Sequence, residues 1–170
     1  MEARATEMKI PPPFEEALRR HERELMRFLL RTTRDREDAL DLFQETWMRA
    51  YRAYPRLDPD THLRPWLFRI ASNLCRNRLR GLARRSRVLA DGDCPEHDVS
   101  NGVAPGADAH AQALDLKRAL ARLSPRQGQA FAMRKFVGLE YGEIAEALGC
   151  SEESARANVY QALKKLKSFR

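Results

Sequence analysis

The chain has 170 residues, of which 43% are hydrophobic, so it can build one packed domain or two small ones. Its net charge of +7 favours an anionic partner, such as nucleic acid or a membrane surface. No apolar run approaches the ~18 residues of a membrane span, no signal-peptide core is present, and three scattered cysteines argue against a disulfide framework. We therefore expect a cytoplasmic protein without direct membrane insertion.

The first predicted helices follow a leader. Residues 1–13 contain three consecutive prolines and are expected to be disordered. Apolar stripes predict helices over Phe14–Arg31 and Asp35–Tyr54, the second burying Leu40, Phe43, Trp47, Ala50 and Tyr54. Beside that stripe lies a second set at helical spacing: Asp41, Gln44, Glu45 and Met48. This acidic and amide surface suits a basic partner helix, but a merely solvated face is the simpler interpretation of the pattern alone.

A third helix is expected after a loop at Pro55–Arg64, because Pro65 suits a first helical turn. One predicted face is apolar, with Leu67, Ile70, Ala71 and Leu74. Another carries cations, amides and a tryptophan: Trp66, Arg69, Asn73, Arg76, Asn77 and Arg80. No acidic residue lies between Arg64 and Arg87. Such a face fits single-stranded DNA. A solvated basic helix with Trp66 in the core is the alternative, and the pattern does not decide between them.

Composition changes at Asp91–Asp108, which is rich in Gly, Asp, Pro and Ala. We expect a flexible linker over residues 89–110, between a first domain at 14–88 and a second at 111–170. Cys94 and His97 form a C-x-x-H pair there, but no matching second pair exists in the sequence. We therefore expect no metal site and no cofactor.

The second domain is predicted to end in a helix-turn-helix. Ser124 and Pro125 begin a helix that runs to about Phe136. Tyr141–Leu148 is a short helix that Gly149 ends, and Ser151 caps the next helix. The apolar face of that last helix carries Ala155, Val159, Ala162, Leu163 and Leu166. Its opposite face suits the DNA major groove, with Glu153, Arg156, Ala157, Tyr160, Gln161 and Lys164. An ordinary helical hairpin with a solvated face is the alternative.

The predicted fold class is therefore all-α, with two small helical domains joined by a flexible linker. Two other functions compete with nucleic-acid binding of this kind. A metal nuclease needs convergent carboxylates, whereas the acids here lie on one helix face or in the linker, so we expect no enzyme. A dimeric operator-binding regulator needs a dimer face or a receiver domain, and the sequence indicates neither.

Four motifs follow one another along the chain: Asp41–Tyr51, Pro65–Asn73, Leu123–Gln127 and Gly138–Ala145. Together they resemble the extracytoplasmic-function sigma factors of bacterial RNA polymerase, in the sigma-70 family. The resemblance extends from Phe14 to Leu166. It implies a sigma-2 domain that binds the polymerase clamp and the promoter −10 element. It also implies a sigma-4 helix-turn-helix domain that binds the polymerase flap and the −35 element.

The resemblance also implies roles for the predicted surfaces. The set Asp41, Gln44, Glu45 and Met48 would meet a basic coiled coil of the largest polymerase subunit. The loop Pro55–Arg64 would hold a flipped base, and the melted −10 strand would lie on Arg64, Trp66, Arg69, Asn73, Arg76, Asn77 and Arg80. Promoter DNA, core RNA polymerase and an anti-sigma factor are the implied partners. Asn77, Gly128 and Ala157-Asn158 depart from common family residues, so the resemblance does not say which promoter bases are preferred.

Overall fold

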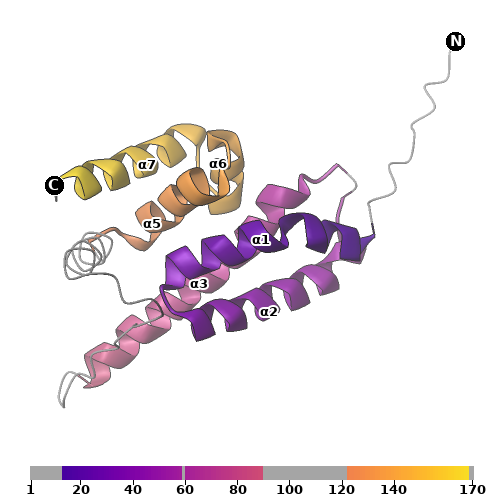
Figure 1. Cartoon of the computed structure of the whole chain (residues 1–170), viewed down its shortest axis with the longest axis horizontal. Coiled ribbons are helices and arrows are strands. Elements are labelled where there is room, and N and C mark those ends of the chain that lie inside the picture. The colour runs from indigo at the N-terminus through magenta and orange to yellow at the C-terminus, as the bar shows by residue number, and fades with distance from the viewer. Residues whose placement is uncertain (1–12, 59, 90–121, 169–170) are drawn as a thin grey trace, which may run out of the picture.

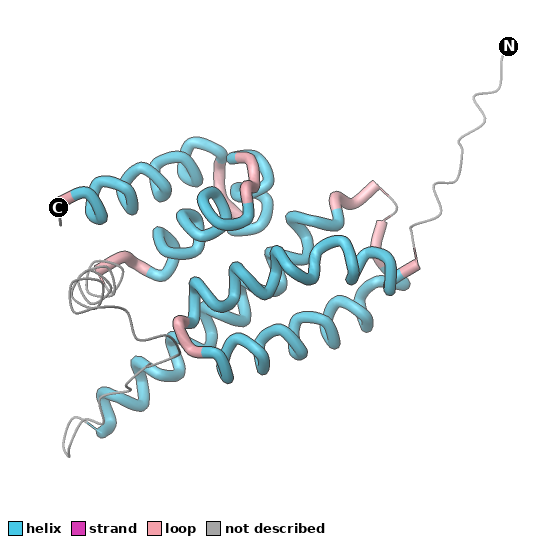
Figure 2. The backbone as a smooth tube through the Cα atoms, in the orientation of Figure 1, coloured by secondary structure: helices cyan, strands magenta, loops and turns pink. Residues whose placement is uncertain are grey.

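The computed structural model describes residues 13–58, 60–89 and 122–168. Over these residues the fold is all-α and contains no strand, as predicted (Figure 2). The predicted leader at 1–13, except for Pro13, lies outside the described residues. So does the predicted linker at 89–110, except for Leu89, which is the last residue of a helix.

Three long helices form the first half of the molecule. Helix α1 spans Phe14–Thr33, α2 spans Arg36–Ala53 and α3 spans Leu63–Leu89, with a short 3₁₀ turn, η1, at Tyr54–Arg56. Arg34 ends α1 in the left-handed region with φ 61°, and the side chain of Asp35 caps α2 by accepting from the Asp38 N–H at 2.8 Å. Helix α3 begins at Leu63, two residues before Pro65, so that Pro65 still lies in its first turn.

One prediction about the buried stripe of α2 is wrong. Leu40 is 42% exposed, and the buried residues are Ala39, Leu42, Thr46, Trp47 and Ala50. Trp47 and Ala50 are buried as predicted. The other three buried residues each lie one position before a predicted one, so the stripe is centred on a slightly different side of the helix. Leu40 thereby moves from the core to the edge of the predicted acidic surface.

The second half is built from shorter helices. Helix α5 spans Pro125–Ala132 and continues as a π-helical turn, η2, at Met133–Val137; α6 spans Tyr141–Leu148 and α7 spans Glu152–Lys167. The expected caps form. Ser124 and Gln127 make a capping box at the start of α5, and Ser151 accepts from the Ser154 N–H at 3.1 Å at the start of α7.

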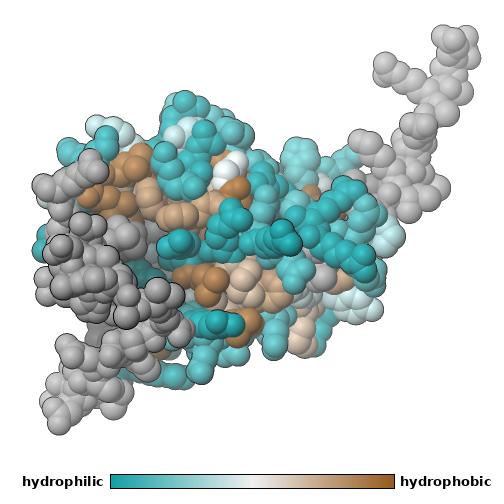
Figure 3. Space-filling model, viewed as in Figure 1, coloured by the Kyte–Doolittle hydropathy of each residue, from teal (hydrophilic) through white to brown (hydrophobic). Residues whose placement is uncertain are grey.

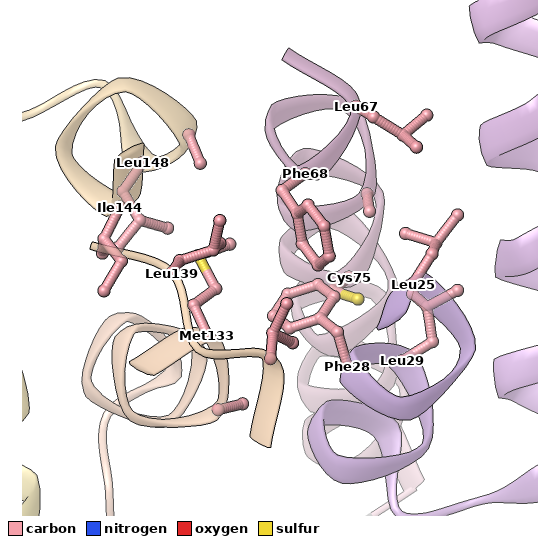
Figure 4. Packing of buried hydrophobic residues seen from close by; sticks show 14 of the residues in the cluster. Leu25, Phe28, Leu29, Leu67, Phe68, Cys75, Met133, Leu139, Ile144 and Leu148 are labelled. Carbon is pink, nitrogen blue, oxygen red and sulfur yellow. The ribbon is translucent and has the colours of Figure 1, made fainter. Parts of the chain in front are cut away.

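The two halves pack directly against each other. Helix α6 lies on α3, and α5 with η2 lies on α1, whereas α2 is on the far side of α1 and α3 (Figure 1). Figure 4 shows Phe28 and Phe68 of the first half facing Met133 and Leu139 of the second. One continuous hydrophobic core therefore runs through both halves. The face shown in Figure 3 is largely hydrophilic, with hydrophobic patches interrupting it.

Candidate nucleic-acid interfaces

The helix-turn-helix forms at the predicted place. Gly149 closes α6 with φ 61°, a left-handed conformation that glycine adopts without steric cost. Ala155, Val159 and Ala162 of α7 are then buried against α5 and α6. The turn and the buried face together fix which side of α7 points to solvent.

All six predicted groove-facing residues lie on the exposed side of α7: Glu153, Arg156, Ala157, Tyr160, Gln161 and Lys164. Tyr160 is 65% exposed. The Arg156 guanidinium contacts Glu152 at 2.6 Å and lies 4.8 Å from the centre of the Tyr141 ring. These contacts orient the guanidinium without burying it, so it stays available to a base edge.

Helix α3 presents a second polar face. Arg69, Asn73, Asn77 and Arg80 are exposed on it. Arg76 is half-buried, and its Nη2 has no hydrogen-bond partner among the described residues. No acidic residue lies on α3 from Leu63 to Leu89, so this face is cationic along its whole length. Such a surface can bind phosphates while its amides meet unpaired bases.

The sequence pattern left open whether Trp66 lies in the core or on the exposed face of α3, and the structure places it between the two. It is half-buried and packs on the core, where it lines a small hollow with Phe14, His21 and Trp47. Trp66 therefore supports the fold and is also partly accessible to solvent.

Arg64 lies apart from the exposed residues of this face. Its Nε and Nη2 donate to the two carboxylate oxygens of Glu24 at 2.9 and 3.0 Å. Its Nη1 donates to Glu143 at 3.3 Å, and its Nη2 also donates to the Val137 carbonyl at 3.1 Å. Burial alone lowers the pKa of Arg64, but the hydrogen bonds and charges of both glutamates outweigh it and raise that pKa. Arg64 is therefore fully charged, and its guanidinium is already hydrogen-bonded to Glu24, Glu143 and the Val137 carbonyl.

The predicted acidic surface lies on the solvent side of α2. Asp41, Gln44 and Met48 are exposed, and Glu45 is half-buried with its carboxylate 2.6 Å from Arg49 Nε. Sequence reasoning missed two neighbours: Leu40 is 42% exposed and Tyr51 is 63% exposed. Both follow the same helical spacing as Gln44 and Met48, which was the available signal. Exposed apolar side chains among acids and amides mark a surface suited to a protein partner.

The loop between α2 and α3 contains local turns. The Asp58 side chain accepts from the Asp60 N–H at 2.9 Å, and its carbonyl accepts from the Thr61 N–H. Pro59 is not described. Among the described residues no three His, Cys, Asp or Glu side chains gather as metal ligands, and Cys94 and His97 lie outside them. Within the same residues no helix is both long and apolar enough to cross a bilayer.

Comparisons with known proteins follow the two halves. The sequence matches two protein-family models, Sigma-70 region 2 over residues 17–85 and Sigma-70, region 4, over residues 113–166. It is similar to the ECF RNA polymerase sigma factor SigM of Mycobacterium tuberculosis, with 33% identity over 156 residues, covering 90% of this chain and 74% of SigM. SigG of the same species is 31% identical over 172 residues; the match covers 88% of this chain but 46% of SigG.

A solved structure shows the same arrangement of helices. It is the sigma factor RpoE in complex with the anti-sigma factor NepR from Bartonella quintana. The two folds superpose with a TM-score of 0.71 at 26% sequence identity, over 92% of this chain and 95% of RpoE. The likeness therefore includes both halves and not one helical domain alone.

Proposed function

Because the chain belongs to the extracytoplasmic-function sigma factors of the sigma-70 family, we propose that it gives promoter recognition to a core RNA polymerase. The observation that carries this proposal is the presence of two separate exposed polar faces, on α3 and on α7, in one chain. A duplex reader needs only one such face. A protein that holds melted and paired DNA together needs both.

The face on α7 is proposed to read the −35 element as duplex. Its exposed Arg156 and Gln161 carry donors that match base edges in the major groove, and Lys164 suits a phosphate. Ala157 between them is small enough to permit close approach. Phosphate contacts would position this helix, and the few base contacts would select the sequence.

The face on α3 is proposed to bind the melted −10 strand. Arg69 and Arg80 would hold phosphates, while Asn73, Asn77 and the open edge of Trp66 would meet unstacked bases. Removing a base from the stack costs a few kcal/mol, which these contacts must offset. The loop at Pro55–Arg64 is proposed to hold the flipped base.

Core RNA polymerase is proposed to bind α2 through Asp41, Gln44, Glu45 and Met48, with Leu40 and Tyr51 extending the surface. Their exposure and their acidic character on a basic protein support a basic partner helix. The sigma-2 domain is proposed to span residues 14–88 and the sigma-4 domain 111–170. The polymerase would perform the bond chemistry, so we assign no catalytic residue or cofactor to this chain. Its place of action would be the cytoplasm, where the promoter is.

An anti-sigma factor is a further proposed partner, because the fold superposes on a sigma factor crystallised with one. Such a partner would compete with polymerase or promoter DNA for one of the surfaces described above. No single residue of this chain identifies it.

The proposal is tested by mixing the purified chain with core RNA polymerase and following both on a gel-filtration column. We expect co-elution, and we expect promoter-dependent run-off transcripts when the mixture is given a library of promoter sequences. A chain that binds duplex DNA tightly by itself but never co-elutes with polymerase would instead be a self-sufficient operator-binding regulator.

A further inference from the structure

A hollow of about 410 Å³ is lined by residues from the end of α1, from α3 and α5, and from the end of α7. Helices α1 and α5, which supply most of its wall, lie close together (Figure 1). Its volume is in the range of small-molecule sites, ~300–1,000 Å³. No carboxylate is among the described residues that line it, and neither is any residue proposed above to contact polymerase or DNA. The hollow is therefore separate from those surfaces.

Apolar side chains form most of the wall of the hollow. Phe131 and Phe136 meet edge to face, with their ring centres 5.8 Å apart. Leu123 and Leu166 also line it. The Arg31 guanidinium lies 4.5 Å from the centre of the Phe136 ring, which places an exposed cation beside this wall. A ligand that fills the hollow therefore needs an apolar body.

Arg34 adds a second cation to the wall, and this one is half-buried. Burial lowers the pKa of its guanidinium, and no carboxylate among the described residues raises that pKa again. By contrast, the half-buried Arg64 is paired with Glu24 and Glu143. Because arginine keeps its proton in proteins, Arg34 carries a partly desolvated charge with no acidic partner in the described part of the chain. A bound anion would supply that partner.

The backbone at Arg34 is also unusual. Arg34 ends α1 with φ 61°, and it is the only residue other than glycine with a positive φ in the described ranges. Glycine is the usual residue at such a helix end, because a side chain disfavours the left-handed region. The chain therefore keeps an arginine where the backbone would be more stable with glycine. Unfavourable conformations of this kind collect at ligand sites.

Gly128 makes room in the hollow from the side of α5. It lies within the helix and lines the hollow, and its φ is not positive, so the helix itself does not require glycine there. An added Cβ would meet no atom within 4 Å. Almost any other residue would form the helix better. The glycine thus leaves open a space that a side chain would otherwise enter.

We infer that this hollow binds a small organic acid, a monocarboxylate with an apolar body. The carboxylate accepts hydrogen bonds from the Arg34 guanidinium, whose fork of N–H groups matches its two oxygens. The apolar body lies along Phe131, Phe136 and Gly128, where it is removed from water. A neutral ligand would leave Arg34 without a counter-charge, and a small inorganic anion would leave the apolar wall uncovered. This site goes beyond the proposed function, which uses none of these residues.

Recognition of the acid is tested by isothermal titration calorimetry of the full chain with octanoate, which we expect to bind. Octan-1-ol has the same tail without the charge, and it should bind at least about tenfold more weakly. Hexanoate should also bind about tenfold more weakly, because each buried methylene contributes a factor of about three to four. Absence of octanoate binding, or equal affinity for octan-1-ol, would overturn the inference. Equal affinity for octanoate and hexanoate would rule out the apolar part of the site.

The role of Arg34 is tested with a matched pair of variants. Arg34→Gln should weaken octanoate binding about tenfold, because it removes the charged hydrogen-bond donor. Its unfolding temperature should stay near that of wild type, since Arg34 has no acidic partner to lose among the described residues. Arg36→Gln removes the same charge two residues away at an exposed position outside the hollow, and it should bind octanoate like wild type. Equal losses in the two variants would reduce the effect to net charge and sink the assignment.

The position of the apolar body is tested by filling the space beside Gly128. Gly128→Leu should abolish octanoate binding and unfold no lower than wild type, because leucine favours the helix. Gly81→Leu is the control: a Cβ on Gly81 of α3 also meets no atom within 4 Å, but Gly81 does not line the hollow. Wild-type octanoate affinity in folded Gly128→Leu would place the ligand elsewhere. None of these measurements involves polymerase or promoter DNA, so such a failure would leave the proposed function intact.

Discussion

Arg156 is the residue whose placement says most about how α7 could read DNA. Its guanidinium is held between the Glu152 carboxylate and the Tyr141 ring, yet it remains mostly exposed. An arginine held in this way loses less side-chain entropy when it meets a base than a freely rotating one. Local contacts that restrain without burying are what a specificity residue needs.

Replacing Arg156 with alanine should weaken −35-dependent transcription, because losing a base contact costs about 1–3 kcal/mol. Run-off transcription from a −35-dependent promoter measures the loss, and gel filtration with core polymerase should show unaltered binding. Lys167→Ala removes the same charge from the same helix outside the predicted set, and it should have a much smaller effect. Equal losses in the two variants would mean that α7 contributes only general electrostatics.

Two glycines of the second half, Gly149 and Gly128, show how a helix-turn-helix depends on backbone conformation. Gly149 sits at φ 61° where α6 ends, whereas Gly128 lies inside α5 with ordinary helical geometry. An added Cβ would meet no atom within 4 Å at either position. Any difference between them therefore comes from the backbone and not from crowding.

We predict that alanine at these two positions changes stability in opposite directions. Gly149→Ala should lower the free energy of unfolding by about 1 kcal/mol, because a side chain disfavours the left-handed region. Gly128→Ala should raise it by about 0.5–1 kcal/mol, because alanine loses less backbone entropy in a helix. Thermal unfolding followed by circular dichroism should show shifts of about 2–4 °C per kcal/mol. Shifts of the same sign would contradict the assigned conformations.

Helix α2 carries its proposed function on one face and its share of the core on the other. Ala39, Leu42 and Ala50 fix the helix against α1 and α3, and none of the proposed polymerase contacts belongs to that buried set. Substitutions on the open face therefore separate binding from folding.

The double variant Gln44→Ala with Glu45→Ala should reduce affinity for core polymerase while leaving the unfolding temperature nearly unchanged. Among the described residues the carboxylate of Glu45 is paired with the exposed Arg49, and surface pairs of this kind contribute at most about 1 kcal/mol to stability. Competition binding against labelled wild-type chain measures the affinity. Glu22→Ala, an exposed acid on α1, is the control for charge. Wild-type affinity in the double variant would remove α2 from the interface.

At the scale of the whole molecule, the two halves share one hydrophobic core. Leu25 and Phe68 belong to the same buried cluster as Met133 and Ile144 (Figure 4). Domains joined only by a tether would each keep a separate core. A shared core couples the folding of the two halves.

Unfolding of the isolated chain should therefore be a single transition. Both tryptophans, Trp47 and Trp66, lie in the first half, whereas circular dichroism reports helices throughout. Tryptophan fluorescence and circular dichroism should thus give coincident curves in a denaturant titration. A dichroism curve with two steps, only one of them matched by fluorescence, would show that the halves unfold independently.

Local features of this fold were predictable because they depend on neighbours in sequence. Gly149 ends α6 and Ser151 caps α7 as their residue types require, and the exposed side of α7 follows from helical spacing alone. The register of α2 failed at Leu40, because several apolar residues on that helix allow two stripes. Only packing against α1 and α3 selects between them.

The sequence by itself determined the helices, their caps, the exposed faces of α3 and α7 and the family, since each depends on short-range patterns. Only the tertiary structure decided how the two halves meet, and therefore which residues of the second half Arg64 and Ser72 contact. In the sequence, Arg64 cannot be distinguished from the other cations of a basic helix. Its partners Glu24 and Glu143 lie 40 and 79 residues away along the chain. Contacts over such separations leave no periodic trace along the chain, because they depend on the shape of two folded surfaces.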